Sequence, residues 1–432
     1  MNPFDNIIGY DYEKKELMRI ADILKNPKAY ENLGAKPPKG LLLDGSPGTG
    51  KTLMANALIH ASGRKAFVCR KDKPNGSFVE QITQTFEQAK ENSPSIILLD
   101  DMDKFANEDE SHRNAEEYVT IQSCIDGVRN LEVFVIATTN DIHSLPDSLI
   151  RAGRFDQIIQ ISKPKYSDAV NIIKHYLKDK KIMSDVDPDY IAKLMSHKSC
   201  ATIESIINRA ANIAGFERCE KIKLSHFIEA ASSSLFRKSQ FDCCKENIDL
   251  SDSNSILSEI VYHEAGHTVV NEILNPESVT LVAIGDNNGY TSRFFGFTED
   301  DARQPEFDIL TSLGGIAAVE QIYGKKGSGC SRDLSDAQSQ IQYFLRDYGK
   351  YGFGFISDVS RRSVSETIIA NREIATATLL ESFYERTKKI IAVNREFLEK
   401  LAHALAEKKI LTAYDIQQIK SDCKIKRCYD AL

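Results

Sequence analysis

The sequence lacks the excess of positive charge that many nucleic-acid-binding proteins carry. It contains 55 Lys and Arg against 62 Asp and Glu, which gives a formal net charge of −7. A mildly acidic chain does not bind nucleic acid through bulk electrostatics. The basic run at residues 178–181 is short and interrupted by an acid, a pattern that is typical of a solvated surface. We therefore expect no nucleic-acid partner.

Long apolar runs and paired cysteine motifs are also missing. The apolar segment at residues 95–99 is far shorter than the roughly 20 residues that a membrane-spanning helix needs. The first residues lack the basic and then apolar pattern of a signal peptide. The nine cysteines include no Cys-x-x-Cys pair, which argues against both a disulfide framework and a thiolate zinc site. These absences predict a protein of cytoplasmic character.

The length and the periodicity of the sequence predict more than one domain. A chain of 432 residues is too long for a single hydrophobic core. In its first part, apolar runs at 40–44, 96–99 and 133–137 alternate with helix-forming segments. Strands that alternate with helices in this way indicate an α/β domain whose parallel sheet has flanking helices.

Strand signals disappear after residue 165. Apolar residues then recur at helical spacing, for example at Ile203, Ile206 and Ala210. A stretch rich in Asp, Ser and Asn resembles a linker, and the chain beyond it is mainly helical. We therefore predict four segments: an α/β domain at 1–165, a small helical domain at 166–237, a linker at 238–255 and a mainly α-helical domain at 256–432.

A complete phosphate-binding loop follows the first predicted strand. Its residues are Gly45, Ser46, Pro47, Gly48, Thr49, Gly50, Lys51 and Thr52. The backbone N–H groups of such a loop close around nucleotide phosphates, and the following helix presents its positive end. Lys51 would neutralise the phosphates, and the Thr52 hydroxyl would hold Mg²⁺. The loop predicts ATP binding with Mg²⁺, and a purely structural glycine-rich turn is the less favoured alternative.

Further residues fall at the positions where an ATPase needs them. Asp100 ends a predicted strand, where a carboxylate that holds Mg²⁺ belongs, and Asp101 is placed to orient the attacking water. Asn140 ends the next predicted strand and is placed to sense the γ-phosphate. Arg151 and Arg154 are candidates for arginine fingers, which stabilise transition-state charge. Each signal is weak alone, and their order after the loop strengthens them together.

The motif His263-Glu264-Ala-Gly-His267 predicts a zinc hydrolase. On a helix the two histidines are four residues apart and share one face, so both imidazoles reach one Zn²⁺. Glu264 is placed to take a proton from a water whose pKa the metal lowers. The surrounding run at 256–274 is apolar enough for a helix, and a surface helix with two incidental histidines is the alternative.

A catalytic zinc site usually has a third protein ligand. No Gly-x-x-His follows His267, so the extended three-histidine motif is absent. Position in the chain alone does not choose among five aspartates. They are Asp286, Asp301, Asp308, Asp333 and Asp336.

Several segments make the chain similar to the FtsH-type AAA zinc proteases. The resemblance extends from about residue 4 to residue 423. Its ATPase part lies in residues 38–45, 86–90 and 151–156 and in the strand before Asp100. Its protease part lies in the zinc motif and in residues 313–318 and 327–333.

This resemblance implies an ATP-dependent zinc endopeptidase that threads unfolded or damaged polypeptide through a homohexameric ring. Arg151 and Arg154 would then reach the ATP of the neighbouring subunit. The resemblance selects Asp333 as the third zinc ligand, although Arg332 replaces the Asn of the family motif. It also implies an exposed strand beside the zinc near residues 289–295, on which an extended substrate would pair.

The chain departs from the family pattern in three ways. Asp101 stands where the family has Glu, and its shorter side chain moves the carboxylate on the order of 1 Å from the water. The pore-loop aromatic is missing from its usual place, so Phe78 is either the gripping residue or part of the core. The transmembrane helices that family members usually carry are absent, so we expect membrane association only through a longer anchored form or a partner.

The sequence is compatible with two alternative functions. In the first, the chain is an AAA remodelling or assembly module in which Asp101 leaves ATP hydrolysis weak. In the second, it is a zinc peptidase that cuts short or already unfolded chains without ATP-driven unfolding, which the altered pore loop favours.

Overall fold

The computed structural model describes residues 2–71, 78–106, 115–150, 153–235, 247–285, 288–294, 304–325, 327, 330–348 and 366–427. The chain divides into two compact units, Met1–Ala230 and Ala231–Leu432. Each unit has its own hydrophobic core. We describe the two units separately.

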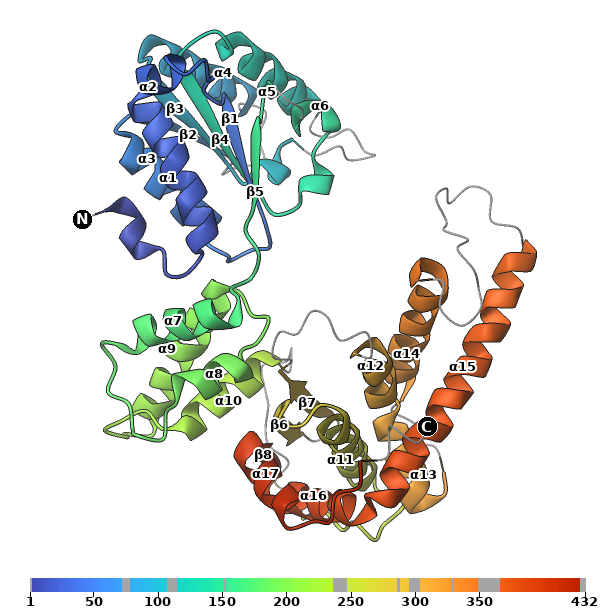
Figure 1. Ribbon diagram of the computed structural model, residues 1–432. Coiled ribbons are helices and arrows are strands. Elements are labelled where there is room, and N and C mark those ends of the chain that lie inside the picture. The colour runs from blue at the N-terminus through green and yellow to red at the C-terminus, as the bar shows by residue number, and fades with distance from the viewer. Residues whose placement is uncertain are drawn as a thin grey trace. The chain divides into compact units, whose positions relative to one another are not determined.

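A five-stranded parallel sheet is the centre of the first unit (Figure 1). Its strands are β1 (Gly40–Asp44), β2 (Lys65–Arg70), β3 (Ser95–Asp100), β4 (Val133–Thr139) and β5 (Gln157–Gln160). They lie in the order β2-β3-β4-β1-β5, and every neighbouring pair is parallel. Every residue of β1, β3 and β4 is buried, which explains why these strands appear in the sequence as continuous apolar runs.

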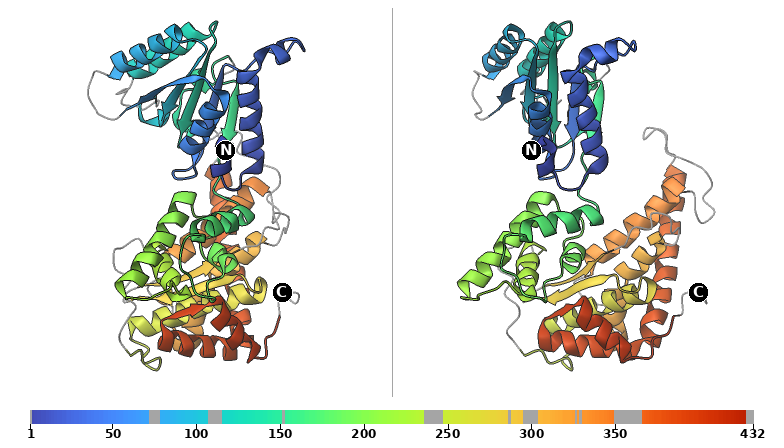
Figure 2. Two further views of the ribbon diagram at one scale, coloured as in Figure 1. Left: turned by 90° about the vertical axis from the view of Figure 1, so that its left-hand side faces the viewer. Right: turned by 60° about the vertical axis from the view of Figure 1, so that its left-hand side comes forward.

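Helices cover both faces of this sheet. The helices α1 (Asp11–Lys25) and α3 (Lys51–Ser62) pack together on one face, while α4 (Phe78–Glu91) and α5 (Ala115–Val128) pack together on the other (Figures 1 and 2). The short elements of this part are η1 (Pro3–Asn6), α2 (Pro27–Glu31), η2 (Met102–Lys104), η3 (Ile142–Ser144) and α6 (Asp147–Ile150). The predicted α/β architecture is confirmed.

The rest of the first unit is helical. It consists of α7 (Tyr166–Leu177), α8 (Pro188–Leu194), α9 (Cys200–Phe216) and α10 (Leu224–Leu235), of which the last crosses the boundary between the units. The Ser199 side chain caps α9 by accepting a hydrogen bond from the Thr202 N–H. The apolar spacing read from the sequence places Ile203, Ile206 and Ala210 on the buried face of this helix.

The second unit is built around helix α11 (Ile256–Leu274), whose residues are buried on nearly all sides. Beside it lies a three-stranded antiparallel sheet in the order β7-β6-β8. The strands are β6 (Val279–Ile284), β7 (Gly289–Arg293) and β8 (Ile410–Thr412). The other elements are α12 (Gln304–Ser312), α13 (Gly314–Tyr323), α14 (Ser331–Tyr343), η4 (Phe344–Tyr348), α15 (Glu366–Val393), α16 (Arg395–Lys408) and α17 (Ala413–Ser421).

Helices α11 and α13 approach each other backbone to backbone. A Cβ on Gly266 would lie 2.3 Å from the Gly314 carbonyl oxygen and 2.5 Å from the Ala318 Cβ. Real Cβ atoms do not approach other atoms this closely, so a larger side chain at position 266 would push the helices apart. This contact holds the middle of α11 in place.

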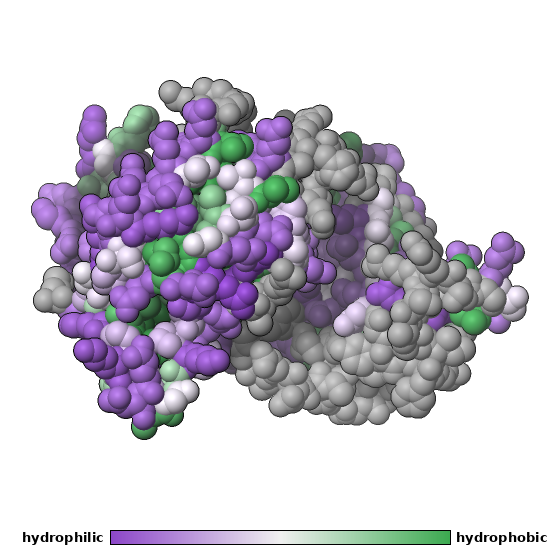
Figure 3. All heavy atoms as spheres, turned by 90° about the horizontal axis from the view of Figure 1, so that it is seen from above, coloured by the Kyte–Doolittle hydropathy of each residue, from purple (hydrophilic) through white to green (hydrophobic). Residues whose placement is uncertain are grey.

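Among the described helices, none is both long and apolar enough to cross a lipid bilayer. Hydrophilic side chains cover most of the coloured surface on the face shown in Figure 3, and the hydrophobic ones form small groups. Scattered groups of this kind are normal on a protein surface.

Candidate nucleotide and zinc sites

The nucleotide-site residues gather at the carboxyl ends of neighbouring strands. The phosphate loop joins β1 to α3, and Lys51 is the first residue of that helix. Asp100 is the last residue of β3, and Asn140 follows β4 directly. Since β3, β4 and β1 are adjacent and parallel, their ends meet at one edge of the sheet.

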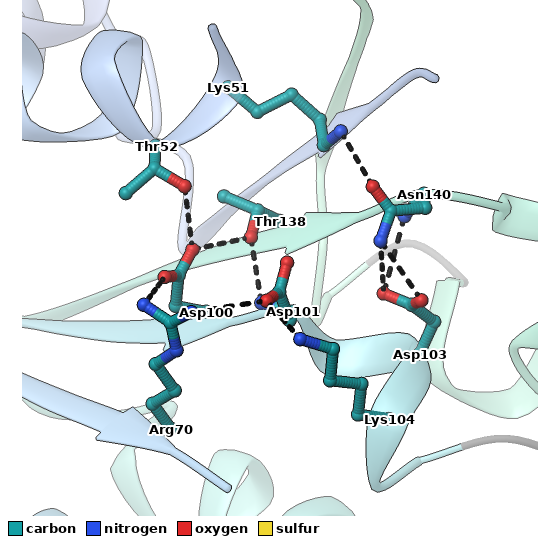
Figure 4. Close-up of polar contacts among 9 residues, drawn as sticks. All are labelled: Lys51, Thr52, Arg70, Asp100, Asp101, Asp103, Lys104, Thr138 and Asn140. Atoms are coloured by element: carbon teal, nitrogen blue, oxygen red, sulfur yellow. Dashed lines mark hydrogen bonds and ion pairs between the residues drawn. The ribbon is translucent and has the colours of Figure 1, made fainter. Parts of the chain in front are cut away.

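Asp100 binds two hydroxyl groups. The Thr52 Oγ1 donates to Asp100 Oδ1 at 3.0 Å, and the Thr138 Oγ1 donates to the same oxygen at 2.8 Å (Figure 4). Thr138 is fully buried and also accepts a hydrogen bond from the Asp101 N–H at 2.9 Å. A hydroxyl and a carboxylate at this distance fit a Mg²⁺ ion that also contacts nucleotide phosphates.

Lys51 is buried against the loop that it follows. Its Nζ donates to the carbonyl oxygens of Gly45 at 2.6 Å and Ser46 at 3.2 Å, and to Asn140 Oδ1 at 3.0 Å. Burial lowers the pKa of Lys51, and the neighbouring carboxylates of Asp101 and Asp103 oppose this change. The ammonium group thus lies at the loop, where nucleotide phosphates would bind.

Asn140 is held from its other side by Asp103. The Asn140 N–H and its side-chain amide donate to the Asp103 carboxylate, each at 3.2 Å to one oxygen (Figure 4). Asp103 therefore fixes the orientation of the residue that we expect to sense the γ-phosphate. The sequence reading missed this role because Asp103 belongs to the short helix η2 and matches no motif position that we assigned.

Asp101 is paired with two cations of its own chain. Its Oδ2 lies 2.6 Å from Lys104 Nζ and 3.7 Å from an Arg70 guanidinium nitrogen (Figure 4). Arg70 also lies 3.5 Å from Asp100 Oδ2. The Asp101 backbone is left-handed, with φ of 56°.

Arg154 forms an ion pair within its own chain. Its guanidinium makes two hydrogen bonds to the Asp126 carboxylate, at 3.0 and 2.7 Å, and also donates to the Ser148 carbonyl. The Arg154 side chain is only 3% exposed, and the hydrogen bond to Asp126 raises its pKa. Arg151 lies outside the described residues.

Phe78, the candidate gripping aromatic, belongs to the hydrophobic core of the first unit. It is 4% exposed and packs edge-on against Phe105, with ring centroids 5.0 Å apart. Of the two interpretations from the sequence, the structure supports the core position. Residues 72–77 lie outside the described residues.

The three side chains predicted to ligate zinc converge in the second unit. His263 and His267 come from α11, and Asp333 comes from the first turn of α14. The two Nε2 atoms are 3.0 Å apart, and Asp333 Oδ2 lies 3.0 Å from the first and 3.4 Å from the second. Ligand atoms of a tetrahedral zinc at about 2 Å from the metal have similar separations, so these residues fit Zn²⁺.

The surroundings prepare these groups for a cation. His267 Nδ1 is 2.7 Å from the Thr311 carbonyl oxygen, so a proton on Nδ1 leaves Nε2 free to ligate. Burial alone would raise the pKa of Asp333, but hydrogen bonds from both imidazoles outweigh it and hold that pKa well below its usual range. Burial alone would lower the pKa of His267, but Asp333 and Glu264 outweigh it and raise that pKa.

The other aspartates that the sequence left open are placed differently. Asp308 forms an ion pair with Arg293 at 3.2 Å. Asp336 lines one cavity together with His263, His267 and Asp333, but it is not one of the three converging side chains. Asp286 and Asp301 lie outside the described residues. Within the described part of the chain, Asp333 is the aspartate that joins the two histidines.

Glu264 lies beside these ligands in a cavity of about 650 Å³. Its side chain comes from the same helix, and the residue is 6% exposed. The Thr291 Oγ1 donates to Glu264 Oε2 at 2.6 Å. The sequence did not predict a role for Thr291, because the identity of a threonine in a strand does not indicate which helix the residue contacts.

Comparisons with known proteins assign a family to each of two parts of the chain. Residues 41–163 match the ATPase family associated with various cellular activities (AAA), and residues 253–419 match peptidase family M41. The ATP-dependent zinc metalloprotease FtsH of Helicobacter pylori strain J99 is 30% identical over 97% of this chain and 70% of its own length. FtsH 3 of Symbiobacterium thermophilum is 30% identical over 96% of this chain and 70% of its own length.

A eukaryotic relative shows the same pattern. The mitochondrial inner membrane i-AAA protease supercomplex subunit YME1 of Saccharomyces cerevisiae is 29% identical over 96% of this chain. The aligned region covers 57% of that longer protein.

The fold and the two sites define an AAA ATPase joined to an M41 zinc peptidase. The chain belongs to the FtsH family of ATP-dependent zinc metalloproteases. It is an ATP-dependent metalloendopeptidase whose cofactors are Zn²⁺, ATP and Mg²⁺, as the sequence predicted. Membership in an AAA protease family also indicates polypeptide substrates and an oligomeric assembly.

Proposed function

We propose that this protease threads unfolded or damaged polypeptides through a homohexameric ring and cleaves them at the zinc site. The observation that carries the proposal is the convergence of His263, His267 and Asp333 beside Glu264, in a chain that also holds a complete nucleotide site. A zinc peptidase site does not by itself require a nucleotide site, and a nucleotide site does not require a peptidase site. Both in one chain support hydrolysis of ATP coupled to hydrolysis of peptide bonds.

At the peptidase site, His263, His267 and Asp333 would hold the metal, and Glu264 would act as the general base. Zn²⁺ held by these residues would supply Lewis-acid chemistry, which lowers the pKa of a water and polarises the scissile carbonyl. Glu264 would take a proton from the attacking water and deliver it to the leaving amine.

The edge strand β7 supplies a surface for the substrate backbone. In the described sheet β7 pairs with β6 on one side only, and Tyr290 and Thr291 line the zinc cavity. An extended polypeptide that adds to this edge would be held by backbone hydrogen bonds, which gives only loose sequence selectivity. Replacement of Tyr290 or Ser292 by proline should abolish proteolysis and spare ATPase activity. Retained proteolysis would exclude this binding mode.

At the nucleotide site, the loop 45–50 and Lys51 would bind the phosphates, and Thr52 with Asp100 would hold Mg²⁺. Asp101 would orient the attacking water, and Asn140 would sense the γ-phosphate. Arg151 and Arg154 remain the finger candidates in the hexamer. Because Arg154 is held by Asp126, it must leave that ion pair before it reaches a neighbour's ATP. Arg151 is therefore the stronger of the two candidates.

The hydrolysis step has its own test. If the short Asp101 side chain leaves ATP hydrolysis weak, Asp101→Glu will raise the steady-state ATPase rate by roughly a hundredfold, the cost of a 1 Å displacement. We expect no such gain, because the family couples ATP to proteolysis. A large gain would favour the remodelling module.

A second candidate function rests on Phe78. Because this aromatic is buried in the core, it is not available to grip a polypeptide, which favours a peptidase that cleaves only unfolded chains.

Any membrane attachment, as the name of YME1 indicates for that relative, would come from a longer form of this chain or from a partner.

One experiment separates these functions. We would measure degradation of a labelled, permanently unfolded protein and of a stably folded one, with Zn²⁺ and with ATP, a non-hydrolysable analogue or no nucleotide. Glu264→Gln serves as the blank. Cleavage of both substrates only with ATP would support the threading protease, and nucleotide-independent cleavage of the unfolded substrate alone would support the simpler peptidase. No cleavage in any condition would overturn the proposal.

A further inference from the structure

The carboxylate of Glu264 has a single hydrogen-bond donor among the described residues. That donor is the Thr291 hydroxyl, which binds Oε2 at 2.6 Å. The same hydroxyl lies 3.4 Å from the Glu264 backbone carbonyl, which also accepts from the Thr268 hydroxyl at 2.8 Å. Glu264 as a residue is 6% exposed, and its Oε2 depends on this single donor, because loss of the hydrogen-bond partner of a largely buried charged group is costly.

The same strand restricts Glu264 by steric contact. Gly289 precedes Thr291 by two residues on β7, so the two positions face the same side of the strand. A Cβ on Gly289 would lie 2.3 Å from Glu264 Cγ and 2.5 Å from Oε1. The pairing of Gly289 with Ile284 and of Thr291 with Val282 fixes this face against α11. Strand β7 therefore limits the side chain through contact at Gly289 and holds it by a hydrogen bond at Thr291.

We propose that Thr291 is a positioning residue for the peptidase reaction, and that its hydroxyl fixes the Glu264 carboxylate in its productive orientation. The hydroxyl occupies Oε2, and no described residue donates to Oε1, which remains available to accept the proton from water. This inference rests on the proposed role of Glu264 as the general base.

The position of Thr291 also ties the base to the substrate. Strand β7 is the edge on which we propose that the substrate backbone pairs, and Thr291 belongs to that strand. One strand would then set the position of both the scissile bond and the base. A reaction that needs two groups aligned to within a fraction of an ångström benefits from such a shared support.

Substitutions at Thr291 separate a hydroxyl effect from a shape effect. Thr291→Val keeps the shape and removes the donor, while Thr291→Ser keeps the donor and removes a methyl group. Thr280→Val is the matched control: Thr280 is a buried threonine on β6 whose hydroxyl donates to the Ser292 carbonyl of β7 at 3.3 Å. It tests the effect of disturbing the sheet without touching Glu264.

The kinetic test uses the full chain and a short fluorogenic peptide. We expect Thr291→Val to lower kcat by about 10- to 100-fold, with KM and zinc content each within about twofold of the native values. Thr291→Ser should restore kcat to within about threefold, and Thr280→Val should leave kcat unchanged. Native kcat in Thr291→Val, with Glu264→Gln inactive, would overturn this inference alone. Retained activity in Glu264→Gln would instead overturn the proposed role of Glu264.

A second test needs no metal. In the zinc-free protein, Thr291→Val should lower Tm by on the order of 3 °C, because it leaves a buried carboxylate without its donor. In a Glu264→Leu background, the same change should lower Tm by less than about 1 °C, because the acceptor is gone. Equal decreases in both backgrounds would show that the hydroxyl and the carboxylate are not coupled, and would overturn the inference.

Discussion

The zinc site and the nucleotide site differ in how their reactive groups are occupied within the chain. In the zinc site, three ligand atoms already face one another at separations that suit a bound metal. In the nucleotide site, Lys51 binds loop carbonyls and Asp101 binds Lys104, so both groups are engaged by neighbours. The three groups of the zinc site therefore face one another, while Lys51 and Asp101 each bind another group of the chain.

This difference suggests why ATP rather than zinc drives the cycle. The three proposed zinc ligands lie on the helices α11 and α14, and their ligand atoms already have separations that suit Zn²⁺. In the role that we propose for Lys51, its Nζ would exchange the Gly45 carbonyl for a phosphate oxygen, and Asp101 would exchange Lys104 for the attacking water. Each exchange alters the contacts between strand ends and loops, and such local changes are the means by which nucleotide states alter a protein's shape.

The largest expected effect tests the zinc half of this comparison. Glu264→Gln should lower peptide hydrolysis about a thousandfold, because it removes the general base, and should leave the ATPase rate within about twofold. Fluorogenic peptide cleavage and phosphate release measure the two activities. Glu259→Gln is the control, since Glu259 lines the same cavity and pairs with Lys325. A similar loss in the control would mean that cavity charge, rather than the base, limits the rate.

Removal of the third ligand should have the next largest effect. Asp333→Asn should weaken zinc binding by more than about 100-fold, because it deletes a charged ligand from a site that is otherwise complete. Titration of the apo-protein with a zinc buffer measures the affinity. Asp336→Asn, one helical turn further along α14, should bind zinc like the native chain. Native affinity in Asp333→Asn would exclude Asp333 as a ligand.

A smaller effect tests whether Arg154 serves its own chain. Arg154→Gln and Asp126→Asn should each destabilise the first unit by about 2 kcal/mol, and the double variant should be no worse than either single variant. For a unit of this size, the expected decrease in Tm is roughly 4–8 °C. If Arg154→Gln keeps the native Tm and loses ATPase activity, Arg154 acts as a finger instead.

The smallest effect tests the occupied state of Asp101. Lys104→Met should raise the ATPase rate by at most about fivefold, because it frees the carboxylate from a half-exposed ion pair worth about 1 kcal/mol or less. Lys90→Met, which breaks a comparable Lys–Glu pair of α4, is the control for a lost surface charge. A decrease in Lys104→Met would show that Lys104 supports catalysis.

The sequence predicted the features whose geometry is local in the chain. A strand, a glycine-rich loop and a helix follow one another directly, so the placement of Lys51 and Thr52 needed no tertiary information. His263 and His267 share a helix face at any position of the helix in the fold. The α/β order of the first unit followed in the same way from alternating apolar runs.

Contacts between distant elements could not be read from spacing. Asp333 was singled out by family resemblance, because five aspartates satisfied the chemistry equally well. The pairs Arg154–Asp126 and Thr291–Glu264 join elements 28 and 27 residues apart, and their formation depends on strand register and helix packing. The sequence allowed Phe78 to be either a substrate-gripping aromatic or a core residue. Its packing against Phe105 shows that it is a core residue.

The close contact of Gly266 with Gly314 shows that the motif at residues 263–267 reflects helix packing as well as metal chemistry. In the motif His-Glu-Ala-Gly-His, the two histidines and the glutamate serve the proposed metal chemistry. The glycine allows the neighbouring helix α13 to approach closely. A pattern search that treats the two middle letters as wild cards therefore discards information about architecture. In this chain, the glycine in the fourth place is where the helix α13 lies directly against the motif.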